Sequence, residues 1–193
     1  MTEHPDLIAA LTPVVEVLER LDVAHQLGGS VASSAYGQAR ATMDVDLVAR
    51  LDESHVRPVV DALQEAYYVD EGAMREAILG RSSFNLIHQA TMMKVDVFVP
   101  KDRPYDAEAL RRRRRDRLDE TPGAREFCVA TPEDVVLSKL EWYDLGGRVS
   151  ERQWSDVLGV LRVQGDAIDE AYLRRWAAEL RVADLLESAL DER

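Results

Sequence analysis

Lysine is scarce in this chain of 193 residues: Lys94, Lys101 and Lys139 are the only lysines among 24 basic residues. The acidic residues number 36, so the formal net charge is −12. A surface that binds nucleic acid along its length needs an excess of positive charge, and this balance argues against one. Any positive surface must therefore be local.

Cysteine, long apolar runs and a basic N-terminal segment are also missing. Cys128 stands alone and cannot form an internal disulfide, which is typical of a reducing cytoplasm, and we expect its thiol to be buried. No run approaches the ~18 apolar residues of a membrane span, and residues 1–6 lack the basic start of a signal peptide. The four histidines are not spaced as zinc ligands. We therefore expect a cytoplasmic protein that does not contact a membrane.

Hydrophobic residues, in contrast, make up 46% of the chain, which is enough to build a core. Apolar residues at helical spacing and short alternating runs predict a mixture of helices and strands. The expected helices cover 6–21, 30–37, 53–68, 72–79, 105–118, 132–145, 150–164 and 169–190, the last broken near Arg181. The expected strands cover 23–27, 43–49, 83–89, 92–99 and 125–130.

The order of these elements is mixed first and wholly helical last. We expect an α/β (α+β) fold, with a small mixed β-sheet and helices on its faces over residues 1–130. Residues 131–193 are expected to form a helical region that packs against this core.

Asp44 and Asp46 lie two positions apart in a predicted strand. Residues i and i+2 of a strand face the same side, so both carboxylates project together. Two adjacent carboxylates repel each other unless a cation compensates, and a hard divalent cation such as Mg²⁺ prefers oxygen ligands. The alternative is a solvated face of the sheet that pairs with Arg40 or Arg50.

Gly28, Gly29 and Ser30 lie where a strand ends and a short helix begins. Glycines let a phosphate approach the backbone, and the first turn of a helix presents free N–H groups. This segment is therefore a candidate phosphate site, although an ordinary strand-to-helix turn has a similar sequence.

Asp96 lies between valines in the strand predicted over 92–99. Interior strands seldom carry an aspartate without a partner, so Asp96 is a third candidate metal ligand. Lys94 lies on the same face, so a private ion pair between the two residues is the alternative.

These elements, in this order, resemble the nucleotidyltransferase superfamily with the polymerase-β-like fold. The family pattern has Gly-Ser, a spacer, Asp-x-Asp on a strand and a third acidic residue on a later strand. Here 13 residues (31–43), among them Arg40 and Thr42, separate Gly29-Ser30 from Asp44, and Asp46 follows two positions later. The sequence looks most like the small bacterial branch that includes the AbiEii-type toxins.

The resemblance implies a transfer of a nucleoside monophosphate from an NTP, such as ATP, to an acceptor, with pyrophosphate released. Asp44, Asp46 and Asp96 would hold one or two Mg²⁺ ions, and Asp96 would also assist deprotonation of the acceptor hydroxyl. Gly28, Gly29 and Ser30 would bind the nucleotide together with Arg40 and Thr42.

The resemblance extends to the helical tail. Lys139 lies where the family places a phosphate-binding lysine, although a lysine that extends from a partly apolar face is an alternative. Asp156 lies in the position of a further nucleotide-binding residue, in a segment that departs from the usual family pattern.

The arginine run concentrates positive charge in one place. Six arginines fall within Arg111–Arg117, interrupted only by Asp116, and give this segment a charge of +5. On the helix expected here they point around the axis, so self-pairing with nearby acidic residues is one interpretation. The other is a docking patch for an anionic acceptor.

Three functional hypotheses follow. The first is a Mg²⁺-dependent nucleotidyltransferase that modifies RNA, a protein or a small molecule, as a toxin with an antitoxin partner if the AbiEii-type resemblance extends to function. The second is a non-catalytic nucleotide-binding or antitoxin-like module. The third is a plain α/β scaffold whose acidic strands pair with arginine.

Overall fold

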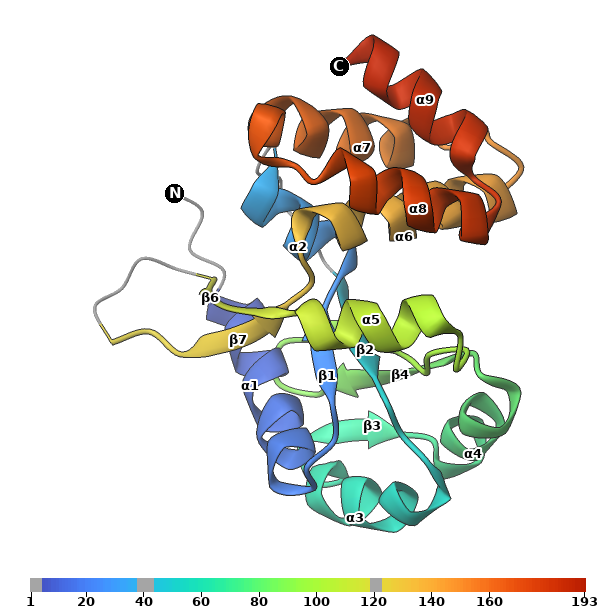
Figure 1. The fold of residues 1–193 in the computed structure, drawn as a ribbon. Coiled ribbons are helices and arrows are strands. Elements are labelled where there is room, and N and C mark those ends of the chain that lie inside the picture. The colour runs from blue at the N-terminus through green and yellow to red at the C-terminus, as the bar shows by residue number, and fades with distance from the viewer. Residues whose placement is uncertain (1–4, 38–43, 119–122) are drawn as a thin grey trace.

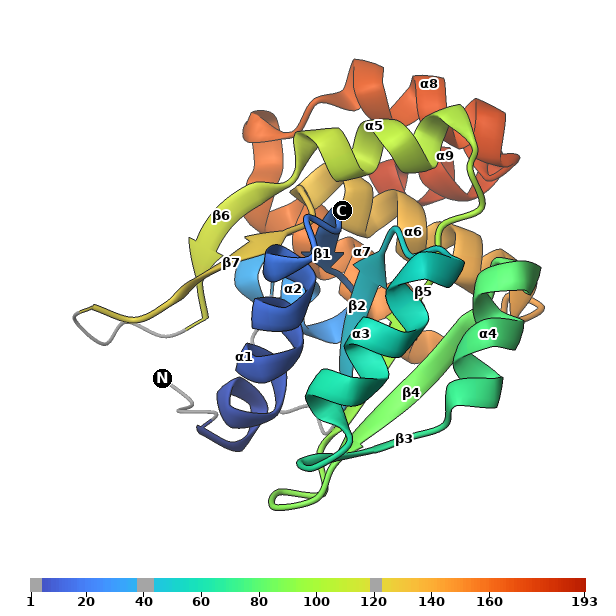
Figure 2. The same ribbon diagram turned by 90° about the horizontal axis from the view of Figure 1, so that it is seen from below.

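A computed structural model describes residues 5–37, 44–118 and 123–193 of the chain. It contains a mixed seven-stranded sheet with the order β3-β4-β5-β2-β1-β7-β6 (Figure 1 and, with β5 labelled, Figure 2). The strands are β1 (His25–Leu27), β2 (Asp44–Ala49), β3 (Tyr67–Val69), β4 (Ser83–His88), β5 (Lys94–Phe98), β6 (Arg114–Arg117) and β7 (Glu126–Val129).

Strand β2 lies at the centre of the sheet, antiparallel to β1 and parallel to β5. Its side chains alternate, so Val45 and Leu47 are fully buried while Asp44 and Asp46 point to the opposite face. Residues Asp46 and Asp96 are direct neighbours across the β2–β5 pair. The sheet therefore presents two acidic strands side by side.

Three helices cover the apolar side of the sheet: α1 (Pro5–Arg20), α3 (Glu53–Leu63) and α4 (Glu71–Gly80). Helix α1 packs against α3 and contacts both β2 and β5 (Figure 2). Its buried residues recur at helical spacing, from Leu7 to Leu18, which gives the helix one apolar face.

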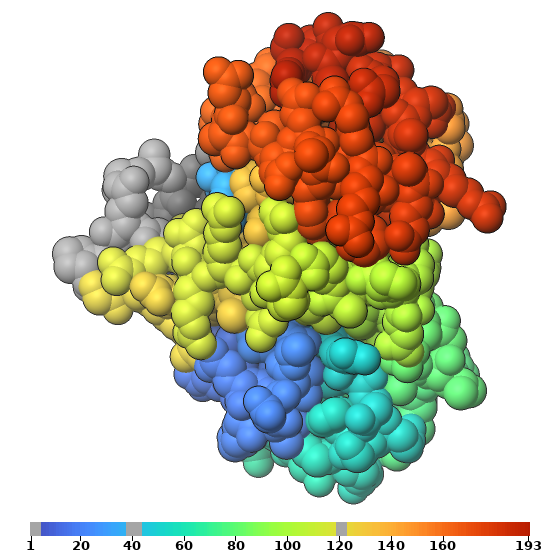
Figure 3. All heavy atoms as spheres, in the orientation of Figure 1, coloured from blue at the N-terminus to red at the C-terminus, as the bar shows by residue number. Residues whose placement is uncertain are grey.

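The remaining helices lie at the other side of the molecule. They are α2 (Gly29–Tyr36), α5 (Pro104–Arg112), α6 (Pro132–Leu145), α7 (Glu151–Gln164), the 3₁₀ turn η1 (Gly165–Ala167), α8 (Glu170–Leu180) and α9 (Ala183–Glu192). Helix α2 contacts α6, α7 and β2, so it joins the sheet to the tail. Helix α5 forms a band between the tail and the rest of the molecule (Figure 3).

The structure corrects the helix expected over 105–118. Helix α5 ends at Arg112, and Arg114–Arg117 form the edge strand β6, antiparallel to β7. Arg112 donates a 2.8 Å hydrogen bond to the buried carboxylate of Glu133, and its guanidinium lies over the ring of Tyr172. This anchorage of Arg112 and the backbone pairing of Arg114–Arg117 with β7 end the helix at Arg112.

The helix expected over 53–68 is also too long. It ends at Leu63, and Tyr67–Val69 form the short strand β3. The Tyr67 ring is buried, and its hydroxyl donates a 2.7 Å hydrogen bond to the backbone oxygen of Ala10 on α1. Tertiary packing therefore overrides the helical pattern here.

The break near Arg181 is confirmed, because α8 ends there in a left-handed residue and α9 begins two residues later. Among the helices that the structure describes, none has the length and apolar character that a membrane span requires.

Candidate functional site

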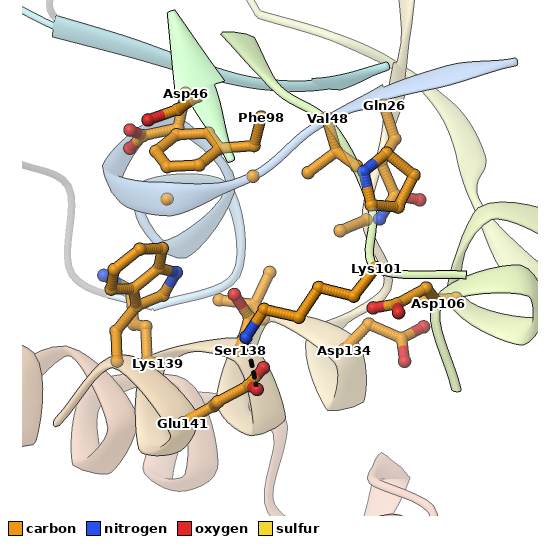
Figure 4. A pocket seen from close by; sticks show the side chains of 18 of the residues that line it. Gln26, Asp46, Val48, Phe98, Lys101, Asp106, Asp134, Ser138, Lys139 and Glu141 are labelled. Atoms are coloured by element: carbon orange, nitrogen blue, oxygen red, sulfur yellow. Dashed lines mark hydrogen bonds and ion pairs between the residues drawn. The ribbon is translucent and has the colours of Figure 1, made fainter. Parts of the chain in front are cut away.

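A cavity of about 530 Å³ lies between the sheet and helices α5, α6 and α7. Figure 4 shows Asp46, Val48 and Phe98 on its sheet side, opposite Lys139 and Glu141 on α6. The Gly28–Ser30 turn also lines it. The structure thus brings the glycine turn, one strand carboxylate and the tail lysine to one place.

Asp46 is held at this cavity by the turn that precedes it in the chain. The Ser30 backbone N–H donates to its carboxylate, and the Gly28 backbone N–H donates to its carbonyl oxygen at 2.9 Å. Gly29 adopts a positive φ of 52°, and a side chain there would overlap the Asp46 carboxylate. The glycine is therefore required by the close approach of the two segments.

The pKa of Asp46 is raised above its ordinary value, mainly because burial disfavours the ionised carboxylate. The hydrogen bond from Ser30 opposes this rise, while nearby Asp96 and Asp44 add to it and Lys139 offsets it. A positive ligand at this carboxylate would lower the pKa again.

Asp44 and Asp96 flank Asp46 but do not line the cavity. The Lys94 ammonium lies 2.9 Å from Asp96 Oδ2 and 3.7 Å from Asp44 Oδ1. The hydrogen bond to Asp96 is the main cause of a raised Lys94 pKa. The ion pair that the sequence allows as an alternative is therefore formed.

The donor set fits a hard divalent cation, since three carboxylates project from the same face of two neighbouring strands. In their present positions, however, these carboxylates do not form a metal site: among the described residues, no group of three or more Asp, Glu, His or Cys side chains could hold a metal ion. Lys94 is a cation already placed between two of the carboxylates. Metal binding would thus need these side chains to turn towards Asp46.

The helix side of the site carries a buried ion pair. Lys139 Nζ donates to Asp156 Oδ2 at 2.8 Å, and the two side chains are only 6% and 12% exposed. Asp156 itself does not line the cavity; it contacts Lys139, which does. Nearby, Arg152 Nη2 donates to the Ser30 hydroxyl at 3.2 Å. Two cations therefore stand beside the glycine turn.

Gln26 is a candidate site residue that the sequence interpretation missed. Its side chain lines the cavity and is 5% exposed, and its Oε1 has no hydrogen-bond partner among the described residues. A buried acceptor without a partner is costly, so a ligand donor at this point would be stabilising. The polar residue in the apolar segment 23–27 was the available signal.

The wall of the cavity formed by helices α5 and α6 and the segment just before α5 carries several charged side chains, and these pair with one another. Arg103 donates to Glu141 at 2.6 Å and to Asp106 at 2.9 Å, and Lys101 lies 3.4 Å from Glu141 (Figure 4). Asp134 also faces the cavity, but its oxygens accept from Thr131 and Tyr172.

Aromatic residues divide between packing and the cavity. Trp176 is buried in the core. Trp142 is 50% exposed, lines the cavity and meets Phe98 edge-on, with the ring centroids 5.7 Å apart.

Several expected residues lie elsewhere. Arg40 and Thr42 fall outside the described residues. Cys128 on β7 is half-buried rather than fully buried. The arginines of the run do not line the cavity, so the run and the site are separate features.

The sequence matches no known family profile and no curated protein sequence. The structure, however, is similar to solved structures of the antibiotic-resistance factor ANT(2'')-Ia. Its solution structure has a TM-score of 0.59 at 9% identity, covering 99% of this chain and 100% of that chain. A crystal structure with adenylyl-2''-tobramycin has a TM-score of 0.57 at 8% identity, covering 91% and 97%.

A third similarity is lower: the lincosamide antibiotic adenylyltransferase LnuA, bound to lincomycin, has a TM-score of 0.47 at 15% identity, covering 79% and 95%. The ANT(2'')-Ia structures share the fold of this chain, and the mixed sheet with its helices confirms the expected α/β fold class. The AbiEii-type branch stays a prediction from the sequence.

Proposed function

We propose that the protein is a Mg²⁺-dependent nucleotidyltransferase that moves a nucleoside monophosphate from an NTP to an acceptor hydroxyl. The observation that carries this proposal is the meeting of Asp46, the Gly28–Ser30 turn and Lys139 around one cavity. The chain keeps all three acidic residues of the family pattern, with Asp44 and Asp96 beside Asp46.

The triphosphate would bind at the glycine turn. Gly29 and Ser30 are the first two residues of helix α2, where the helix dipole favours negative charge. The Gly29 backbone and the Ser30 hydroxyl would contact the phosphates. Lys139 and Arg152 supply the positive charge, with Arg152 already bonded to Ser30. The ammonium acts as a point charge, whereas the guanidinium can bind two phosphate oxygens.

Asp44, Asp46 and Asp96 would hold one or two Mg²⁺ ions. When bound, such ions stabilise negative charge on the attacking and leaving oxygens of an in-line displacement. The carboxylates alone would repel a triphosphate, so their role depends on this counter-charge.

In the transfer, the acceptor oxygen attacks the α-phosphorus of the NTP and forms a new P–O bond. The bond from the α-phosphorus to the α–β bridging oxygen breaks, and pyrophosphate leaves with that electron pair. Once it has left Lys94 and turned towards Asp46, Asp96 takes the proton of the acceptor hydroxyl. Lys139 and Arg152 hold the departing pyrophosphate, where negative charge increases.

The acceptor is proposed to be a small molecule rather than RNA or a protein. A cavity of about 530 Å³ suits small ligands, and Gln26, Phe98 and Trp142 offer a carboxamide and two aromatic surfaces. ATP as the NTP, and a toxin role with an antitoxin partner, are proposed on the sequence resemblance alone.

The direct test is to incubate purified protein with Mg²⁺ and each of four α-labelled NTPs, together with a cell extract separated by molecular size. We expect label to enter the small-molecule fraction and pyrophosphate to be released. Asp46→Asn should lower the transfer at least ~1,000-fold, since it removes a metal ligand. Asp61→Asn, an exposed change on α3, is the matched control.

Equal transfer by wild-type protein and Asp46→Asn would contradict the proposal. So would equal binding of Mg²⁺–NTP by both, because the metal would then lie elsewhere.

A second candidate is a non-catalytic nucleotide-binding module. The Lys94–Asp96 ion pair favours it, because it satisfies a carboxylate that catalysis would need. Such a module would bind an NTP but release no pyrophosphate with any extract fraction.

A further inference from the structure

Lys94 occupies the place between the strand carboxylates where positive charge is needed. It precedes Asp96 by two residues on β5, so the two side chains share a face, and it lies directly beside Asp44 in the β2–β5 register. Its ammonium contacts Asp96 at 2.9 Å and Asp44 at 3.7 Å.

We propose that Lys94 is a built-in counter-cation, which neutralises the carboxylates of the nucleotide-free protein and competes with the divalent cation for them. This inference rests on the proposed function and adds a residue that sets metal affinity. The competition is direct, because the oxygen of Asp96 that accepts from Lys94 is also a candidate metal ligand.

The ion pair is placed so that it can be exchanged. The Lys94 side chain is 39% exposed and that of Asp96 is 21% exposed, so water can solvate the ammonium once it leaves. Partly exposed ion pairs of this kind contribute little to stability. Lysine also has a flexible stem, which allows its ammonium to move while the strand stays in place.

Competition links metal binding to nucleotide binding. A bare divalent cation must displace Lys94 against charge repulsion, whereas a cation that arrives with a triphosphate brings negative charge that offsets this repulsion. Lys94 would therefore keep metal affinity low until the nucleotide is present.

The test measures Mn²⁺ binding to the nucleotide-free full chain by electron paramagnetic resonance, which counts the free ion. Lys94→Met and Lys94→Gln should each tighten Mn²⁺ binding about tenfold, because both remove the competing charge. Lys94→Arg keeps the charge and should bind like the wild type. Arg57→Gln, which removes an exposed charge from α3, is the control for net charge.

The gain for Lys94→Met and Lys94→Gln should shrink when inorganic tripolyphosphate is added. Because the two variants differ in polarity, one remains informative if the other does not fold, as judged by circular dichroism. Unchanged or weaker Mn²⁺ binding in the folded variant would overturn the inference. The absence of Mn²⁺ binding in both the wild type and the folded variant would overturn it too.

The outcome is separable from the proposed function. Adding Asp46→Asn to Lys94→Met should abolish the gain; if it does not, the three carboxylates are not the metal site and the proposed function fails with them. Transfer of label by the wild type, with no effect of Lys94 on Mn²⁺ binding, would instead overturn only the competition. A loss of tripolyphosphate binding in Lys94→Met without a change in Mn²⁺ affinity would also overturn it, since Lys94 would then be a phosphate ligand.

Discussion

The two lysine–carboxylate pairs of the site differ in how deeply they are buried. Lys139 and Asp156 join α6 to α7 and are almost inaccessible, whereas Lys94 and Asp96 share one strand and are partly solvated. A buried charge is costly to leave without its partner, but an exposed one is readily solvated. The helix side is therefore fixed, and the strand side is free to exchange its cation.

The largest effect should come from breaking the buried pair. Lys139→Met removes the ammonium beside Asp156 and should lower the free energy of unfolding by about 3 kcal/mol. Lys94→Met should lower it by less than about 1 kcal/mol. Urea unfolding of both variants measures the difference, and equal losses would contradict the comparison.

Activity separates the structural role of Lys139 from its binding role. The double variant Lys139→Met, Asp156→Leu should regain most of the lost stability, because no charge remains buried. Its kcat/KM should stay about 100-fold below that of the wild type, because a phosphate contact is missing. If the double variant regains both its stability and its kcat/KM, Lys139 has a structural role only.

Asp46 provides a test by pH on the strand side. Burial raises its pKa in the folded protein, so the folded state holds this proton more tightly than the unfolded chain. Its contribution to stability is then greatest at acidic pH and is lost as the pH rises through the raised value. Asp46→Asn should be more stable than the wild type at pH 7, with a difference that shrinks as the pH falls towards 4.

Urea unfolding across this pH range measures both curves. An Asp46→Asn variant that is less stable at pH 7, or as pH-dependent as the wild type, would contradict the assigned cause.

A smaller effect is expected at Gln26. Gln26→Leu removes a buried oxygen that has no partner among the described residues, so stability should be unchanged or slightly higher. If a ligand donor meets this oxygen, the variant should raise KM for that ligand about tenfold. Gln64→Leu, at the exposed end of α3, is the control. An unchanged KM for both NTP and acceptor would place the ligand elsewhere.

The smallest effect is expected from the arginine edge strand. The side chains of β6 are exposed and do not line the cavity. Replacing Arg114, Arg115 and Arg117 with Gln should leave NTP binding and transfer to a small acceptor unchanged within about twofold. A fall in transfer with intact NTP binding would show that a large anionic acceptor docks here.

Local sequence patterns predicted much of the strand side. The alternation in 43–49 places Asp44 and Asp46 on one face, and the glycine pair marks the turn that reaches Asp46. These features depend on neighbours in the chain, so spacing is enough to predict them.

Other features depend on partners that are distant in the chain. The helix expected over 105–118 fails because Arg114–Arg117 pair with β7, which no local pattern indicates. Gln26 acquires its position only when the sheet and helices α5, α6 and α7 come together and form the cavity. The sequence offered the Lys94–Asp96 pair only as an alternative, because choosing between an ion pair and a metal ligand requires side-chain positions.

The parallel pairing of β2 with β5 also bears on how the protein folds. Asp44 and Lys94 are about 50 residues apart in the chain, so their contact forms only after a long loop closes, which is a slow kind of step. As the strands meet, carboxylates approach one another and their repulsion rises. Lys94 lies on the same strand as Asp96. The pairing of β5 with β2 therefore brings the Lys94 ammonium to the carboxylates in the same step that brings the carboxylates together. Their repulsion is relieved before any ion or nucleotide has bound.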